Sequence, residues 1–201
     1  MNTQARQQAL DEIRRYIAFE ITSGFSVAGF DHIIDMALAA ASDGDDVEHL
    51  RPSAEQLLRE AIASKRAEEK RWPAVTDCDR LDSAFAALEN AGIICRQHFC
   101  CCGMCGVAEM PAQIEQERRA GREFRGYAFY HAQETQLAAL YGSLSLNYGP
   151  TLGGEKECVD IGREIVSTLR AHGLQVEWDE TMQKRIGIKL DWKRRRPQSG
   201  R

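Results

Sequence analysis

Residues 93–106 read Ile93-Ile94-Cys95-Arg96-Gln97-His98-Phe99-Cys100-Cys101-Cys102-Gly103-Met104-Cys105-Gly106. The stretch 93–101 places its side chains alternately on two faces, which is the pattern of a β-strand. A cysteine-rich turn with two glycines follows. The sequence therefore predicts a strand over 93–101 that runs directly into a cluster holding four of the chain's seven cysteines.

Upstream of this stretch the pattern is helical. Apolar residues at helical spacing predict one helix over about 4–22, a second that Ser26 caps and that runs to Ala41, and a third that begins at Pro52 and stops at Pro73. The acidic turn 42–46 lacks the glutamate that closes a calcium loop, so we interpret it as a solvated loop. Residues 1–72 are thus expected to form an N-terminal helical segment.

Downstream, helix and strand patterns alternate. A helix capped by Thr76 or Asp77 is expected before residue 93, and a polar helix is expected to begin at Pro111, a residue favoured in the first turn. Strand-like segments follow near 127–129 and 144–148, with a helix at 135–141 between them. A long helix that buries Cys158 and a β-hairpin of 174–178 with 186–192 complete the chain.

These patterns predict an α/β protein of the α+β type. We expect a mixed sheet of about five strands, packed by helices, in a C-terminal domain over 73–201. The two predicted domains are therefore 1–72 and 73–201.

Composition limits the classes of function. The chain has 201 residues, 43% of them hydrophobic, and a formal net charge of -4, which argues against nucleic-acid binding. The basic run 193–196 is interpreted as a solvated end. No apolar stretch could serve as a leader or span a membrane, so a cytoplasmic protein is expected. A protein partner or a homo-oligomer remains open.

The Cys-x-x-Cys motif formed by Cys102 and Cys105 suits two kinds of chemistry. Two thiolates at this spacing can share one zinc ion, but structural zinc takes four protein ligands. The chain has no second such motif, so the missing ligands would come from Cys101, His98, His131 or another subunit. Zinc is accordingly the one cofactor considered.

The same motif could cycle between dithiol and disulfide, because cytosolic thiols are otherwise kept reduced. A helix that begins only at Pro111 would leave both cysteines without the helix N-terminus that stabilises a thiolate. Cys101, Cys102 and Cys105 are the predicted metal or redox residues, and His98 and His131 are possible additional ligands or partners. No catalytic residue is assigned.

Three functions therefore remain in competition. The first is a binding or regulatory protein with a metal or thiol-switch site. The second is a thiol-dependent oxidoreductase or another enzyme with a cysteine nucleophile, in which His131 lies near the thiol. The third is a non-catalytic interaction module whose cysteines only fill space.

Several segments resemble an uncharacterised bacterial family that is labelled only as a domain of unknown function. The resemblance lies in residues 76–88, continues through Gly92-Ile93 and 97–106, and extends to 126–131, 161–164, 176–179 and 190–192. It implies that Cys101, Cys102 and Cys105 match family cysteines, whereas Cys100 stands where a small polar residue is usual. It implies no activity.

Overall fold

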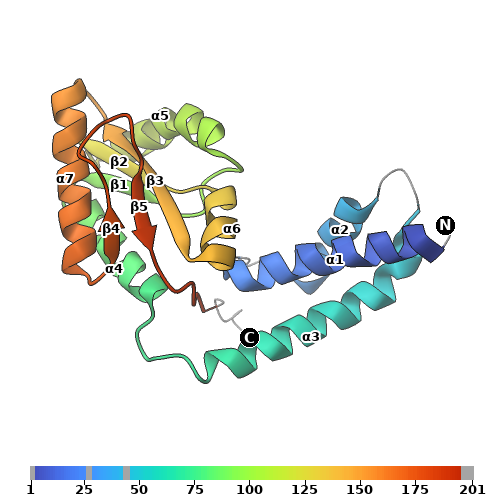
Figure 1. The fold of residues 1–201 in the computed structure, drawn as a ribbon. Coiled ribbons are helices and arrows are strands. Elements are labelled where there is room, and N and C mark those ends of the chain that lie inside the picture. The colour runs from blue at the N-terminus through green and yellow to red at the C-terminus, as the bar shows by residue number, and fades with distance from the viewer. Residues whose placement is uncertain (1–2, 26–28, 43–45, 196–201) are drawn as a thin grey trace. The chain divides into compact units, whose positions relative to one another are not determined.

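The computed structural model describes residues 3–25, 29–42 and 46–195. The chain divides into one unit of residues 1–73 and 194–201 and a second unit of residues 74–193. Helices alone make up the first unit, and a mixed five-stranded sheet with helices makes up the second (Figure 1), which confirms the predicted α+β class. The predicted cap Ser26, residues 43–45 of the acidic turn and residues 196–197 lie outside the described residues.

The first unit contains α1 (Thr3–Ser23), α2 (Phe30–Ala41), the short 3-10 helix η1 (Glu48–Leu50) and α3 (Arg51–Glu69). Their apolar stripes form one core. The chain's C-terminal residues join this unit, where the Arg194 guanidinium lies 4.4 Å from the centre of the Phe25 ring. Arg194 is buried, so the interpretation of this basic run as a solvated end was wrong for that residue.

The second unit begins with α4 (Asp77–Asn90), which Thr76 caps by accepting a hydrogen bond from the Asp79 backbone N–H. There follow β1 (Ile93–Arg96), α5 (Gly103–Arg119), β2 (Gly126–Phe129), α6 (Ala132–Tyr141), β3 (Ser143–Pro150), α7 (Glu155–Ala171), β4 (Gln175–Glu177) and β5 (Ile186–Lys189). The strand order is β1-β2-β3-β5-β4. Only β1 and β2 are parallel, and β4 and β5 form the predicted antiparallel pair.

The helices cover both faces of this sheet (Figure 1). Met110 of α5 packs with Ile94 and Phe129 in one buried cluster, so α5 lies on the face to which these strand residues point. Ile161 of α7 lies against Gly126, which points to the opposite face. The β1–α5–β2 unit therefore holds α5 against the parallel pair of strands.

Two predicted boundaries were wrong, and both concern the cysteines. The strand ends at Arg96 rather than at 101, because His98 and Cys100 have positive φ angles of 52° and 60° that no strand continues through. The helix begins at Gly103, not at Pro111, which lies inside it. Val107 is exposed, so water can reach the carbonyl oxygen that the missing Pro111 N–H leaves unbonded.

Over the described residues, none of the helices combines the length and the apolar character that crossing a membrane requires.

Candidate thiol site

The cysteine cluster lies where β1 passes into α5. Cys102 is the N-cap residue of α5 and Cys105 lies in its first turn. His131 is the N-cap residue of α6 and follows β2 directly. Because β1 and β2 are parallel, their carboxyl ends meet at one edge of the sheet, which is where open α/β sheets commonly bind ligands.

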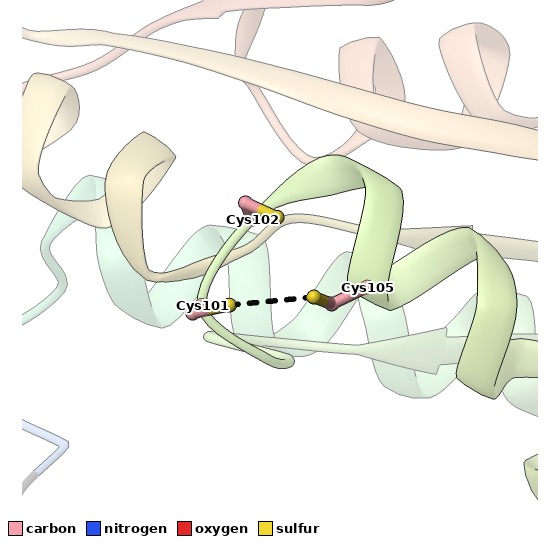
Figure 2. Close-up of side chains that lie close together, drawn as sticks. All are labelled: Cys101, Cys102 and Cys105. Carbon is pink, nitrogen blue, oxygen red and sulfur yellow. Dashed lines mark hydrogen bonds between the residues drawn. The ribbon is translucent and has the colours of Figure 1, made fainter.

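Three sulfurs converge at this edge (Figure 2). The Sγ atoms of Cys101, Cys102 and Cys105 all lie within 4.8 Å of one another, and the Cys101 thiol lies 3.5 Å from the Cys105 sulfur. Cys101 is exposed, while Cys102 and Cys105 are partly exposed. The three predicted cysteines are thus brought together where solvent, a metal ion or a reactant can reach them.

The helix start separates the behaviour of the two motif thiols. The backbone N–H of Cys105 points toward the Cys102 sulfur and, with the Cys105 and Cys101 thiols, lowers the pKa of Cys102. Hydrogen bonding to Cys101 and Cys102 has the opposite effect on Cys105 and raises its pKa to about 12. At neutral pH the Cys102 thiolate is therefore favoured, while Cys105 keeps its proton.

Cys100 stands apart from these three residues. Its thiol donates a hydrogen bond of 3.2 Å to Oε2 of Glu109 on α5. Desolvation, followed by this hydrogen bond, raises the pKa of Cys100 to about 11. Cys100 is thereby kept protonated and outside the three-sulfur group.

The two candidate histidines have different places. Nδ1 of His98 lies 2.9 Å from Oγ1 of Thr135 on α6. His131 is buried with only 5% of its surface exposed, and burial lowers its pKa. Its Nε2 lies 3.4 Å from the position that a Cβ on Gly103 would occupy. Within the described part of the chain, neither histidine joins the three sulfurs as a fourth ligand.

The family comparison covers almost the whole chain. A family model described as a domain of unknown function, DUF6891, matches residues 6–196. The chain belongs to the DUF6891 family. This match confirms the resemblance to a domain of unknown function, and it spans both units of the structure. Searches of the curated proteins and of the solved structures returned no match.

In this DUF6891 domain the sequence interpretation missed Asn147. It lies on β3 directly opposite Phe129 of β2, so its side chain is on the same face of the sheet as α5. Its Nδ2 lies 3.8 Å from the Cβ position of Gly103. The alternation of residues 144–148 contained this signal, because Ser145 and Asn147 occupy the face opposite the apolar one.

Proposed function

We propose that this DUF6891 domain is a regulatory or binding protein whose Cys102 and Cys105 form a thiol–disulfide switch. The observation that supports it best is the position of the motif at the start of α5. Cys102 is the N-cap residue, Cys105 lies in the first turn, and their sulfurs are within 4.8 Å of each other. This is the arrangement that the sequence had not predicted, because it placed the helix start at Pro111.

The chemistry follows from the difference between the two thiols. The Cys102 thiolate attacks one sulfur of a disulfide reactant, the S–S bond breaks, and one half of the reactant leaves as a thiolate. Cys105 then loses its proton, and its sulfur attacks Cys102 and displaces the second half. The reactant gains two electrons and two protons, and the protein dithiol becomes a disulfide.

The first experiment maps disulfides in the full-length protein. Reduced protein is exposed to a small excess of oxidised glutathione, free thiols are blocked, and peptides are sequenced by mass spectrometry. We expect a Cys102–Cys105 disulfide that reductant reverses. Cys102→Ser should abolish it, whereas the matched control Cys100→Ser should retain it, because Cys100 hydrogen-bonds Glu109 instead.

Only slow, non-specific mixed disulfides in the wild-type protein would refute the switch. A bridge between Cys101 and Cys105 would refute the assignment of Cys102 as the attacking thiol, since these sulfurs already lie 3.5 Å apart. An unreactive cluster with unchanged stability in the serine variants would favour the third reading, in which the cysteines only fill space.

A metal site is the second candidate, because three sulfurs converge rather than two. Tetrahedral zinc with Zn–S bonds of about 2.3 Å places its sulfurs about 3.8 Å apart. The sulfurs of Cys101, Cys102 and Cys105 lie within 4.8 Å of one another, so small side-chain rotations would suffice. The three thiols are soft donors suited to zinc, and the fourth position would remain for water or another molecule.

Native mass spectrometry separates the two candidates. Protein purified without chelator or reductant is compared with its denatured mass. An excess of one zinc ion that is lost on denaturation, and that Cys101→Ser removes, would support the metal site. A mass two hydrogens lower than that of the free thiols, restored by reductant, would support the switch. The alternative of a thiol-dependent enzyme requires, in addition, turnover of a disulfide reactant.

A further inference from the structure

A small niche lies beside the cysteine motif at Gly103, the first residue of α5. A Cβ placed on Gly103 would stand 3.4 Å from Nε2 of His131 and 3.8 Å from Nδ2 of Asn147, both of which are ordinary contact distances. The space that Gly103 leaves open is therefore about the size of one methyl group or one oxygen atom. We call it the Gly103 niche, defined by Gly103, His131 and Asn147.

Two polar groups at this niche lack partners. Among the described residues, the buried atoms Nδ2 of Asn147 and Nδ1 of His131 make no hydrogen bond. Only 6% of the His131 side chain is exposed, and its ring edge faces Gly103. A buried donor without a partner costs about 1–3 kcal/mol, so an acceptor atom that entered the niche would be held firmly.

The helix termini add further donors. Within the described residues, neither Cys102 at the start of α5 nor His131 at the start of α6 makes a side-chain capping hydrogen bond. The first backbone N–H groups of a helix carry partial positive charge. The niche therefore combines an amide donor, an imidazole and a helix N-terminus, all of which favour an oxygen acceptor.

The surrounding charges favour a neutral acceptor over an anion. Oε1 of Glu134 lies 3.9 Å from Nε2 of His131, and Glu134 is only 4% exposed. Arg185 donates to this carboxylate at 2.6 Å, and the Ser145 backbone N–H donates to it at 2.9 Å. The carboxylate is thus neutralised in place, and a second anion would have to lose its water beside it.

The surface next to the motif is apolar. Met104, between the two motif cysteines, is 83% exposed, and Val107 is 51% exposed. These side chains offer contact to a polypeptide chain passing over Cys102. A backbone carbonyl is the neutral oxygen that such a chain carries at every residue.

From these observations, and resting on the proposed thiol switch, we propose that the Gly103 niche receives a backbone carbonyl oxygen of a peptide whose disulfide reacts with Cys102. Asn147 donates to that oxygen, and the peptide is aligned for attack by the Cys102 sulfur. His131 and Asn147 act as positioning residues. The reactant class is accordingly a peptide disulfide rather than a disulfide without amide groups.

The test compares two reactants with the reduced full-length protein. One is the disulfide of N-acetylcysteine amide, which carries amide carbonyls, and the other is bis(2-hydroxyethyl) disulfide, which does not. Each rate of oxidation is divided by the rate of the same disulfide with dithiothreitol. We expect the protein to favour the amide reactant by about tenfold after this correction, as one buried hydrogen bond provides.

Gly103→Ala fills the niche at ordinary contact distance, and Asn147→Ala removes the amide donor. Both variants should lose the preference while still reacting with bis(2-hydroxyethyl) disulfide. Gly154→Ala is the matched control, because Gly154 also precedes a helix and the nearest atom to its Cβ position, Oε2 of Glu157, is 3.9 Å away. It should keep the preference.

The outcomes separate this proposal from the one on which it rests. Equal corrected rates in the wild-type protein, or a preference that survives both variants, would overturn the role of the niche and leave the switch intact. A loss of thermal stability in Gly103→Ala with an unchanged preference would instead mean that the niche holds a structural water. No reaction with either disulfide would overturn the switch and the niche together.

Discussion

Gly106 in the first turns of α5 lies directly against the ring of Phe129 on β2. A Cβ on Gly106 would stand 2.3 Å from Cε2 of Phe129, which is far inside contact distance. The Phe129 ring cannot move aside easily, because it is fully buried and packs edge-on against Phe99 with ring centres 5.7 Å apart. The close approach of helix and strand at Gly106 therefore sets the height at which Cys105 stands above the sheet.

Gly106→Ala should consequently destabilise the protein, although alanine is the better helix former. Overpacking of a well-filled core costs about 1–3 kcal/mol, and urea unfolding would measure it. Gly103→Ala is the comparison within the same helix turn, because its Cβ has ordinary contacts only, and it should change the free energy of unfolding by less than about 1 kcal/mol. Equal losses in the two variants would contradict the contact with Phe129.

The pH dependence of alkylation should distinguish the cysteines of the cluster. Thiolate is the reactive form, so each labelling rate rises with pH and levels off above the pKa of its thiol. The pKa of Cys102 is lowered by the Cys105 backbone N–H, whereas those of Cys100 and Cys105 are raised to about 11 and about 12. Cys102 should therefore be labelled first near neutral pH.

Its rate should fall about tenfold per pH unit once the pH drops below its pKa. Iodoacetamide labelling of the native reduced protein, read by fragmentation of the peptide that holds these cysteines, would measure the order. Labelling of Cys105 before Cys102 would show that the helix start does not favour the Cys102 thiolate.

Glu109 offers a separate test of Cys100. Desolvation is the largest cause of the raised pKa of Cys100, and the hydrogen bond to Glu109 is the second. Glu109→Gln removes the negative charge but keeps an acceptor, so the pKa should fall and stay above its ordinary value. The alkaline midpoint of Cys100 labelling would report the change.

Glu115→Gln on the same helix is the control, because Glu115 pairs with Arg118 and Arg119 instead of a cysteine. It should leave the labelling of Cys100 unchanged. An unaltered midpoint in Glu109→Gln would mean that burial alone sets the pKa of Cys100.

The sequence was sufficient for the fold class, because periodic apolar residues report directly which face of a helix or strand is buried. It was insufficient at the site for two local reasons. His98 and Cys100 adopt positive φ angles, which the alternating pattern of 93–101 does not reveal. Pro111 is usual in a first turn but lies inside α5 here, at a surface where a missing hydrogen bond is tolerable.

The convergence of the site was also beyond a single sequence. The parallel pairing of β1 and β2 brings His131 to the start of α5, and the antiparallel pairing of β2 and β3 brings Asn147 there. Strand pairing is a long-range property, and cysteine spacing carries no information about it. Cys101, Cys102 and Cys105 were predictable as a group because they are neighbours in the chain.

The ion pair between Glu134 and Arg185 should hold the buried side of the niche in place. Glu134 is 4% exposed and Arg185 is 48% exposed. Arg185→Ala leaves a buried carboxylate with the Ser145 backbone N–H as its donor, at a cost of about 3 kcal/mol in urea unfolding. Arg163→Ala is the matched control, because Arg163 and its partner Glu180 are each 58% exposed, and it should cost less than about 1 kcal/mol.

The double variant Glu134→Gln with Arg185→Ala identifies the cause of that loss. A glutamine is neutral and still accepts the hydrogen bond from the Ser145 backbone, so the double variant should recover much of the stability that Arg185→Ala loses. If it recovers none, then the loss comes from the packing of the Arg185 side chain and not from an unpaired charge. In that case the neutral surroundings argued for the Gly103 niche would lose their physical basis, because Glu134 would tolerate burial without its partner.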